Sequence, residues 1–114
     1  PAKKSKSDID IELAENTEDE EYLNILYKNL KILNQNKYDF IFYVAGVDIH
    51  FEDRLGKLKI TDTGVNKRDQ IVIENFNRRS IPLCGVLGGG YNKSFEKLIE
   101  LHSMLHKNCA EIIK

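Results

Sequence analysis

Hydrophobic and polar positions along the chain follow two periods, and together they predict five elements. Apolar residues recur at helical spacing in three segments, and they occupy nearly every position in two short runs between those segments. Continuous apolar runs of this kind are typical of strands in parallel sheets. The predicted elements are a helix over about 17–36, a strand over 40–45, a helix over about 61–79, a strand over 82–87, and a final helix opened by Asn92 or Ser94.

The order helix–strand–helix–strand–helix predicts an α/β fold with a right-handed crossover from residue 39 to 91. Thr17 followed by Glu20 predicts a capping box at the first helix. Apolar spacing then predicts the inward faces of the two later helices. These faces are Val65, Val72, Ile73 and Phe76 in the second helix, and Phe95, Ile99, His102, His106, Cys109 and Ile113 in the third.

The two strands predict a sheet that is wider than this chain. The run at 40–45 is apolar at every position, which is typical of a central strand covered on both faces. A sheet of two such strands would have apolar faces that three helices cover only in part, and an open edge is expected at Phe40–Val44. Residues 1–16 form a polar lead-in, in which the alternation at 8–13 predicts either an edge strand or an extended loop.

Composition excludes several classes of protein and sets an expected location. The 114 residues fit one domain or a piece of one, and a net charge of -1 argues against a nucleic-acid partner. No run reaches transmembrane length, so no membrane role is expected. Cys84 and Cys109 share no metal or redox spacing, so both thiols are expected to be buried in a reducing compartment. The predicted location is the cytoplasm.

Chemistry-bearing side chains stand where the two predicted strands end. Asp48 closes the segment 39–48, and Tyr91 closes the segment 82–91. Ligands of open α/β sheets bind at the carboxyl ends of strands, so both side chains are candidates for a site. A carboxylate at the end of a core strand is expected to have a partner. Tyr91 is either a surface turn residue or a hydrogen-bond donor for a developing oxyanion.

Three consecutive glycines, Gly88, Gly89 and Gly90, precede Tyr91 and invite comparison with phosphate-binding loops. The P-loop pattern fails, because Tyr91 and Asn92 stand where lysine and serine or threonine are required. The dinucleotide fingerprint also fails, since the glycines are contiguous. A tight turn that needs positive φ angles is the interpretation favoured on these residues alone.

The histidines offer two weaker metal motifs. Asp48 and His50 form an Asp-x-His pair, but a surface histidine beside a carboxylate is the commoner arrangement. His102 and His106 are four residues apart on one helix, as in helical zinc pairs. No glutamate follows His102 directly, so hydrogen-bonded histidines at the margin of the core are favoured.

Taken together, these residues resemble the zinc-dependent deacetylases, which include histone deacetylases, the bacterial acetoin-utilisation type and acetylpolyamine amidohydrolases. The motifs that carry the resemblance, in order, are SDIDIEL to TEDEEYL over 7–23, VAGVD ending at Asp48, EDRLG at 52–56, TDTG at 61–64 and VLGGGY ending at Tyr91. The resemblance implies an arginase/deacetylase-type three-layer fold, of which residues 1–114 are the C-terminal part.

The resemblance also implies roles for the matched positions. Asp48 corresponds to the third protein ligand of a catalytic zinc, and Tyr91 to the tyrosine that stabilises the tetrahedral oxyanion. Arg54 corresponds to a structural position in the turn. The implied residues of the acyl-lysine channel are Gly88, Gly89 and Gly90 in its wall and Leu55 at its mouth.

The family also carries a His-His pair and an Asp-x-His motif upstream, and both are missing here, since His50 is the first histidine. One carboxylate does not hold a catalytic zinc, which needs about three protein ligands. The chain alone is therefore expected to bind no zinc and to hydrolyse no acetylated amine. Either a separate N-terminal half completes a split enzyme, or the chain is a non-catalytic relic or binding piece.

The resemblance leaves the acylated substrate open among histones, acetylpolyamines and small metabolites. An unrelated alternative is a small anion-binding module that uses the glycine turn. Phosphate binding that survives both Tyr91→Phe and Asp48→Ala would favour that alternative.

Overall fold

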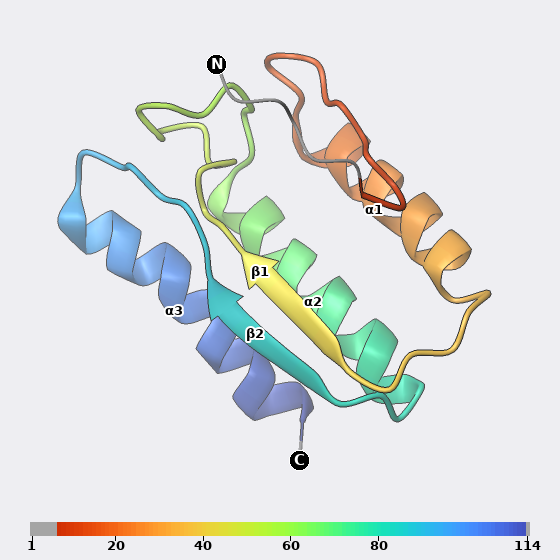
Figure 1. Cartoon of the computed structure of the whole chain (residues 1–114). Helices are drawn as coiled ribbons and strands as arrows, with labels where there is room; N and C mark the ends of the chain where they lie inside the picture. The colour runs from red at the N-terminus through yellow and green to blue at the C-terminus, as the bar shows by residue number, and fades with distance from the viewer. Residues whose placement is uncertain (1–6, 114) are drawn as a thin grey trace.

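The structure, a computed structural model, describes residues 7–113 and contains the predicted elements in the predicted order (Figure 1). Strands β1 and β2 pair in parallel, with Ile41 opposite Leu83 and Ala45 opposite Leu87. The fold class is therefore α/β, as the sequence predicts. The bounds are α1 Asp19–Leu33, β1 Ile41–Ala45, α2 Asp62–Arg78, β2 Leu83–Leu87 and α3 Phe95–Ile112.

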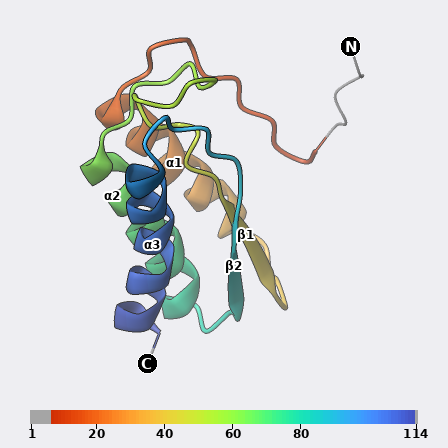
Figure 2. The same cartoon turned by 90° about the vertical axis from the view of Figure 1, so that its left-hand side faces the viewer.

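The core lies between the helices and one face of the sheet. Figure 2 shows the helices on the same side of β1 and β2. Helix α2 packs against both α1 and α3, and the predicted inward face of α2 is confirmed. Thr61 is the N-cap of α2, since its Oγ1 accepts a hydrogen bond from Gly64 N at 3.1 Å. The buried apolar side chains are Leu30, Ala45, Val47, Ile60, Val65, Val72, Ile73, Phe76, Leu101 and Leu105.

The opposite face of the sheet is bare within the described part of the chain. Phe42 is 74% exposed and Val44 is 66% exposed, although both belong to the strand predicted to be covered on both faces. The two-stranded sheet has no further strand beside β1 in residues 7–113, so the predicted open edge is confirmed there. Alternation in β1 sends Ile41 and Tyr43 to the helices and leaves the intervening side chains uncovered.

The predicted capping box at Thr17 is wrong. Helix α1 begins one residue later than expected, with Glu18 at its N-cap and no side-chain capping bond. The Thr17 hydroxyl instead donates to Ala14 O at 2.6 Å, and Thr17 O accepts from Lys59 N at 2.9 Å. Thr17 is thus held by the loop that precedes α2, and residues 7–17 contain no strand.

The predicted inner stripe of α3 is also mostly wrong. Phe95 is 73% exposed, Ile99 is 54% exposed and His106 is exposed, whereas Cys109 is half-buried as part of the core margin. Helix α3 has two overlapping apolar stripes, and spacing alone does not decide which one meets α2. The stripe that packs inward contains Leu98, Leu101, Leu105, Asn108 and Ile112.

The expectation that both thiols are buried holds for neither cysteine in full. Cys84 is exposed and Cys109 is half-buried. Cys84 occupies an outward position of β2, on the bare face of the sheet.

Replacing Ile73 with alanine tests the core. Ile73 is fully buried and packs with Ala45 and Leu105, so Ile73→Ala is expected to lower the free energy of unfolding by about 2–5 kcal/mol. Ile32→Ala on α1 is the control, because Ile32 is 42% exposed and its truncation should cost less than about 0.5 kcal/mol. Urea titration of both variants measures the difference, and equal losses would contradict this assignment of the core.

Candidate active site

The loops that follow β1 and β2 meet at one end of the sheet, at the top of Figure 1. Val47 N donates to Gly89 O at 2.7 Å. A Cβ atom on Gly88 would lie 2.8 Å from both Cα and N of Gly46. This close approach of two backbones requires glycine and brings the two strand ends together.

Asp48 and Tyr91 lie beside the same glycine. A Cβ atom on Gly89 would lie 2.6 Å from Asp48 Oδ2 and 3.6 Å from Tyr91 Cε2. A Cβ atom on Gly46 would lie 3.0 Å from the other Asp48 oxygen, Oδ1. The structure therefore places the predicted carboxylate and the predicted phenol next to the same glycine, Gly89.

The glycines are needed for space and not for turn geometry. No glycine among the described residues has a positive φ angle, so the expectation of a turn that needs positive φ is wrong. Gly90 is crowded as well, since its Cβ atom would lie 2.7 Å from Val47 Cγ2 and 2.8 Å from Leu98 Cδ1. Side chains at these positions would fill the space beside Asp48 or push against the core.

The expectation that the Asp48 carboxylate has a partner is not met within the described residues. Asp48 is half-buried, yet no donor in the described residues hydrogen-bonds its carboxylate. Tyr91 is 49% exposed, and its hydroxyl likewise has no hydrogen-bond partner within residues 7–113. Both groups are therefore free to bind something that this part of the chain does not contain.

Leu55 lies in the turn next to Tyr91. Arg54 N donates to Tyr91 O at 3.3 Å, which joins the turn to the β2–α3 loop. Leu55 is 64% exposed, and the Arg54 side chain is exposed too. The backbone of this turn contacts the β2–α3 loop at Tyr91, and the Leu55 side chain is exposed.

His50 is not available as a metal ligand. Its Nδ1 accepts a hydrogen bond from Glu52 N at 3.2 Å, so Nε2 carries the hydrogen and donates to Asp62 Oδ1 at 2.6 Å. The side chain is also fully buried, which corrects the interpretation of a surface histidine beside a carboxylate. His50 holds the loop to the N-terminus of α2.

The ionisation of Asp62 makes its contacts with His50 and Lys97 dependent on pH. The hydrogen bond from Lys97 Nζ, at 2.7 Å, lowers the pKa of Asp62, burial opposes that effect, and the bond from His50 lowers the pKa further. The Asp62 carboxylate therefore binds a proton less readily in the folded state than in the unfolded state, where an aspartate has a pKa of about 3.9. The stabilisation is present above that value and is lost as the pH falls through the lower, folded-state pKa.

We expect acid to destabilise the wild-type chain more than it destabilises Asp62→Asn. Urea titrations at pH values from about 6 down to about 2 measure the free energy of unfolding of both proteins. The difference in free energy of unfolding between the two proteins should shrink below about pH 4, where the Asp62 carboxylate of the unfolded state becomes protonated. Two parallel curves over this range would contradict the role given to Asp62.

The pair His102 and His106 does not form a metal site in the structure. His106 is exposed, whereas His102 is half-buried and its Nδ1 has no partner among the described residues. The expected hydrogen bonding is therefore absent at that nitrogen. Burial lowers the pKa of His102, and the nearby Arg68 charge lowers it further. Nε2 of His102 would lie 3.1 Å from a Cβ atom on Gly90, so the ring lies against the glycine loop.

A buried polar network beneath the site escaped the sequence analysis. Arg68 Nη1 donates to Gly46 O at 2.5 Å, and its other nitrogens donate to Asp69 Oδ1 at 3.1 Å. Tyr43 donates to the same oxygen at 2.5 Å, and burial raises the pKa of this phenol. The available signal was that Arg68 and Asp69 fall on the inward stripe of α2, where charges must be paired.

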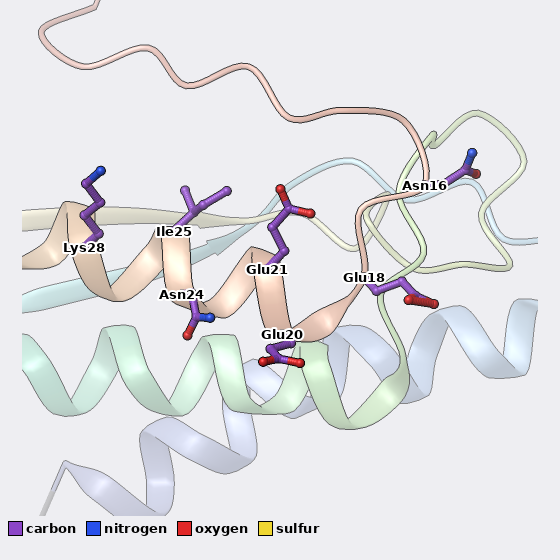
Figure 3. A pocket seen from close by; sticks show the side chains of 7 residues that line it. All are labelled: Asn16, Glu18, Glu20, Glu21, Asn24, Ile25 and Lys28. Atoms are coloured by element: carbon purple, nitrogen blue, oxygen red, sulfur yellow. The ribbon is translucent and has the colours of Figure 1, made fainter.

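A hollow of the surface lies away from the strand ends, beside α1. It has a volume of about 510 Å³ and opens along the outside of α1 (Figure 3). Glu18, Glu20 and Glu21 point in different directions and do not converge on one position. The full lining is Asn16, Glu18, Glu20, Glu21, Asn24, Ile25 and Lys28.

Comparison with known proteins identifies the family. The histone deacetylase domain matches residues 2–105. An uncharacterized protein of Picosynechococcus sp. is 42% identical over 113 residues, which are 98% of this chain and 38% of that protein. Histone deacetylase 2 of Arabidopsis thaliana is 36% identical over 93 residues, which are 81% of this chain and 24% of that protein. The chain belongs to the histone deacetylase domain family.

The match covers a part of the relatives only, since the chain spans 38% and 24% of their lengths. Within residues 7–113 no group of three or more histidine, cysteine, aspartate or glutamate side chains is arranged to hold a metal ion. The chemistry and setting of Asp48 fit one zinc ligand, and the described residues do not supply a complete zinc site. None of the described helices is both long enough and apolar enough to span a membrane.

Proposed function

We propose that this chain is the C-terminal part of a zinc-dependent deacetylase that hydrolyses acetyl-lysine or a related acetyl amide. Asp48 would supply one zinc ligand, and Tyr91 would donate a hydrogen bond to the substrate. The observation that carries the proposal is the pairing of an unbonded carboxylate and an unbonded phenol around Gly89. Membership of the deacetylase family supports it.

Tyr91 suits the stabilisation of an oxyanion. When a nucleophile adds to an amide carbonyl, negative charge develops on the oxygen, and a donor already in place stabilises that charge. The Tyr91 hydroxyl has no hydrogen-bond partner within the described chain, so it can donate to this oxygen without first breaking a bond. Gly89 has no side chain between the Tyr91 ring and the Asp48 carboxylate, so both groups can act on the same substrate amide.

On its own the chain would be inactive, because it lacks the His-His pair and two of the zinc ligands of the family. We propose that a separate N-terminal deacetylase half is its partner, in the cytoplasm. The bare apolar face at Phe42 and Val44 and the open edge of β1 support a partner that extends the sheet. A non-catalytic relic or binding piece is the alternative, and activity assays separate the two.

Zinc content tests the assignment of Asp48. The completed protein for this test is a chimera in which the present chain replaces the matching 113 residues of the Picosynechococcus relative. We expect about one zinc per chimera, and a loss of affinity of at least about 100-fold in Asp48→Ala, since three protein ligands are needed. Asp39→Ala is the matched control, because Asp39 is exposed and lies before β1. Full zinc content in Asp48→Ala would refute the role of Asp48.

A further inference from the structure

The Asp53 side chain holds both the turn at 53–56 and the backbone of Tyr91. Its Oδ2 accepts hydrogen bonds from Leu55 N at 3.0 Å and from Gly56 N at 2.8 Å. Its Oδ1 accepts a hydrogen bond from Tyr91 N at 2.6 Å. Asp53 is only 8% exposed, so this carboxylate is bound by three backbone amides in a largely dry setting.

A turn by itself requires only half of this arrangement. An aspartate that caps its own turn accepts bonds from amides two or three residues ahead, as Oδ2 does here. The bond from Oδ1 reaches a residue 38 positions away, on the loop after β2. Tyr91 O is held by the same turn through Arg54 N, at 3.3 Å. The two backbone polar groups of Tyr91 are thus both fixed by residues 53 and 54.

The Tyr91 side chain depends on this backbone anchor. The ring is 49% exposed, and within residues 7–113 no group hydrogen-bonds its hydroxyl. The three preceding glycines have no side chains that could pack against the ring. The turn also adjoins Asp48, because a Cβ atom on Gly56 would overlap the Asp48 carbonyl oxygen. Asp53 therefore links the backbone positions of Tyr91 and Asp48.

We propose that Asp53 is a positioning residue for Tyr91, a role that rests on the proposed deacetylase function. Its charge and its two oxygens set the distance between the Tyr91 hydroxyl and the substrate carbonyl. Asparagine cannot replace it, because one oxygen becomes an NH₂ group that faces a backbone donor. A displacement of the reacting groups by about 1 Å can cost about 10²-fold in rate.

The first test uses the chain alone and needs no activity. In the wild-type chain we expect a scalar coupling through the hydrogen bond from Tyr91 N to Asp53 Cγ, detected by NMR. In Asp53→Asn, amide exchange should become at least about 10-fold faster at Tyr91 and stay unchanged at Ile73 in the core. Glu52→Gln is the matched control. Glu52 is the residue before Asp53 and its side chain is exposed, so this substitution also removes one negative charge. An absent coupling in the wild-type chain would refute the anchor even if Asp53→Asn does not fold.

The second test uses the chimera and separates positioning from mere structural support. Asp53→Asn should lower kcat for acetyl-lysine hydrolysis by about 10- to 100-fold and change KM by less than about threefold. In the Tyr91→Phe background the same substitution should have no further effect, because Asp53 acts through Tyr91. If Asp53→Asn lowers kcat in the Tyr91→Phe background as much as it does in the wild-type chimera, the positioning role is wrong. No hydrolysis by the wild-type chimera would refute the proposed function, while the NMR result would still decide whether Asp53 anchors Tyr91.

Discussion

Replacing Tyr91 with phenylalanine is expected to lower kcat of the chimera by about 10²- to 10³-fold, because the substitution removes one preorganised donor to the oxyanion. The effect should fall on kcat more than on KM, since the bond strengthens as charge develops in the transition state. Steady-state kinetics with an acetyl-lysine peptide measure both constants. A variant that keeps more than about a tenth of wild-type kcat would contradict the role of Tyr91.

The fold should tolerate this substitution. The Tyr91 hydroxyl makes no hydrogen bond within the described residues and the side chain is 49% exposed, so the free energy of unfolding should change by less than about 0.5 kcal/mol. Tyr27→Phe on α1 is the matched control, because Tyr27 is 53% exposed and lies far from the strand ends in sequence. Its kcat should equal that of the wild-type chimera.

Replacing Gly89 with alanine is expected to damage the site more than the fold. The new Cβ atom would lie 2.6 Å from Asp48 Oδ2 and 3.6 Å from Tyr91 Cε2, so the carboxylate must move. Because the obstructing atom is the end of a side chain, the fold can adjust while the site cannot. We expect hydrolysis to fall by at least about 100-fold, together with weaker zinc binding.

Gly85→Ala provides the contrast for that variant. Its Cβ atom would meet Leu105 at 2.8 Å in the core and would not approach Asp48. We expect Gly85→Ala to lower the free energy of unfolding by about 1–3 kcal/mol through overpacking and to leave zinc affinity unchanged. Equal zinc affinities in Gly89→Ala and the wild-type chimera would contradict the site as described.

Local patterns predicted the elements well because they depend on neighbouring residues. Thr61, where the second helix was predicted to begin, caps α2, and Ser94, one of the two residues predicted to open the last helix, caps α3. The meeting of Asp48 and Tyr91 was also predictable, since parallel strands end at one edge of a sheet. The inner face of α3 was not predictable, because two apolar stripes have nearly the same spacing and tertiary packing chooses between them.

Contacts between distant residues explain the other differences. His50 is buried through its bond to Asp62, and Asp53 reaches Tyr91 across 38 positions. The sequence separations of these two pairs follow no helix or strand period, so the sequence pattern does not predict the contacts. The bare face at Phe42 has a different cause, because a fully apolar strand predicts two covered faces and residues 7–113 supply helices on one side only.

Hydrolysis of acetyl-lysine tests the central claim most directly. The purified chain, the chain co-produced with the reading frame encoded upstream, and the chimera are assayed with zinc, each with Tyr91→Phe as control. We predict no turnover by the chain alone, and turnover in a completed sample that Tyr91→Phe lowers by about 10²- to 10³-fold. Zinc-dependent turnover by the chain alone would contradict the claim that its site is partial. No turnover in any completed sample would contradict the deacetylase function itself.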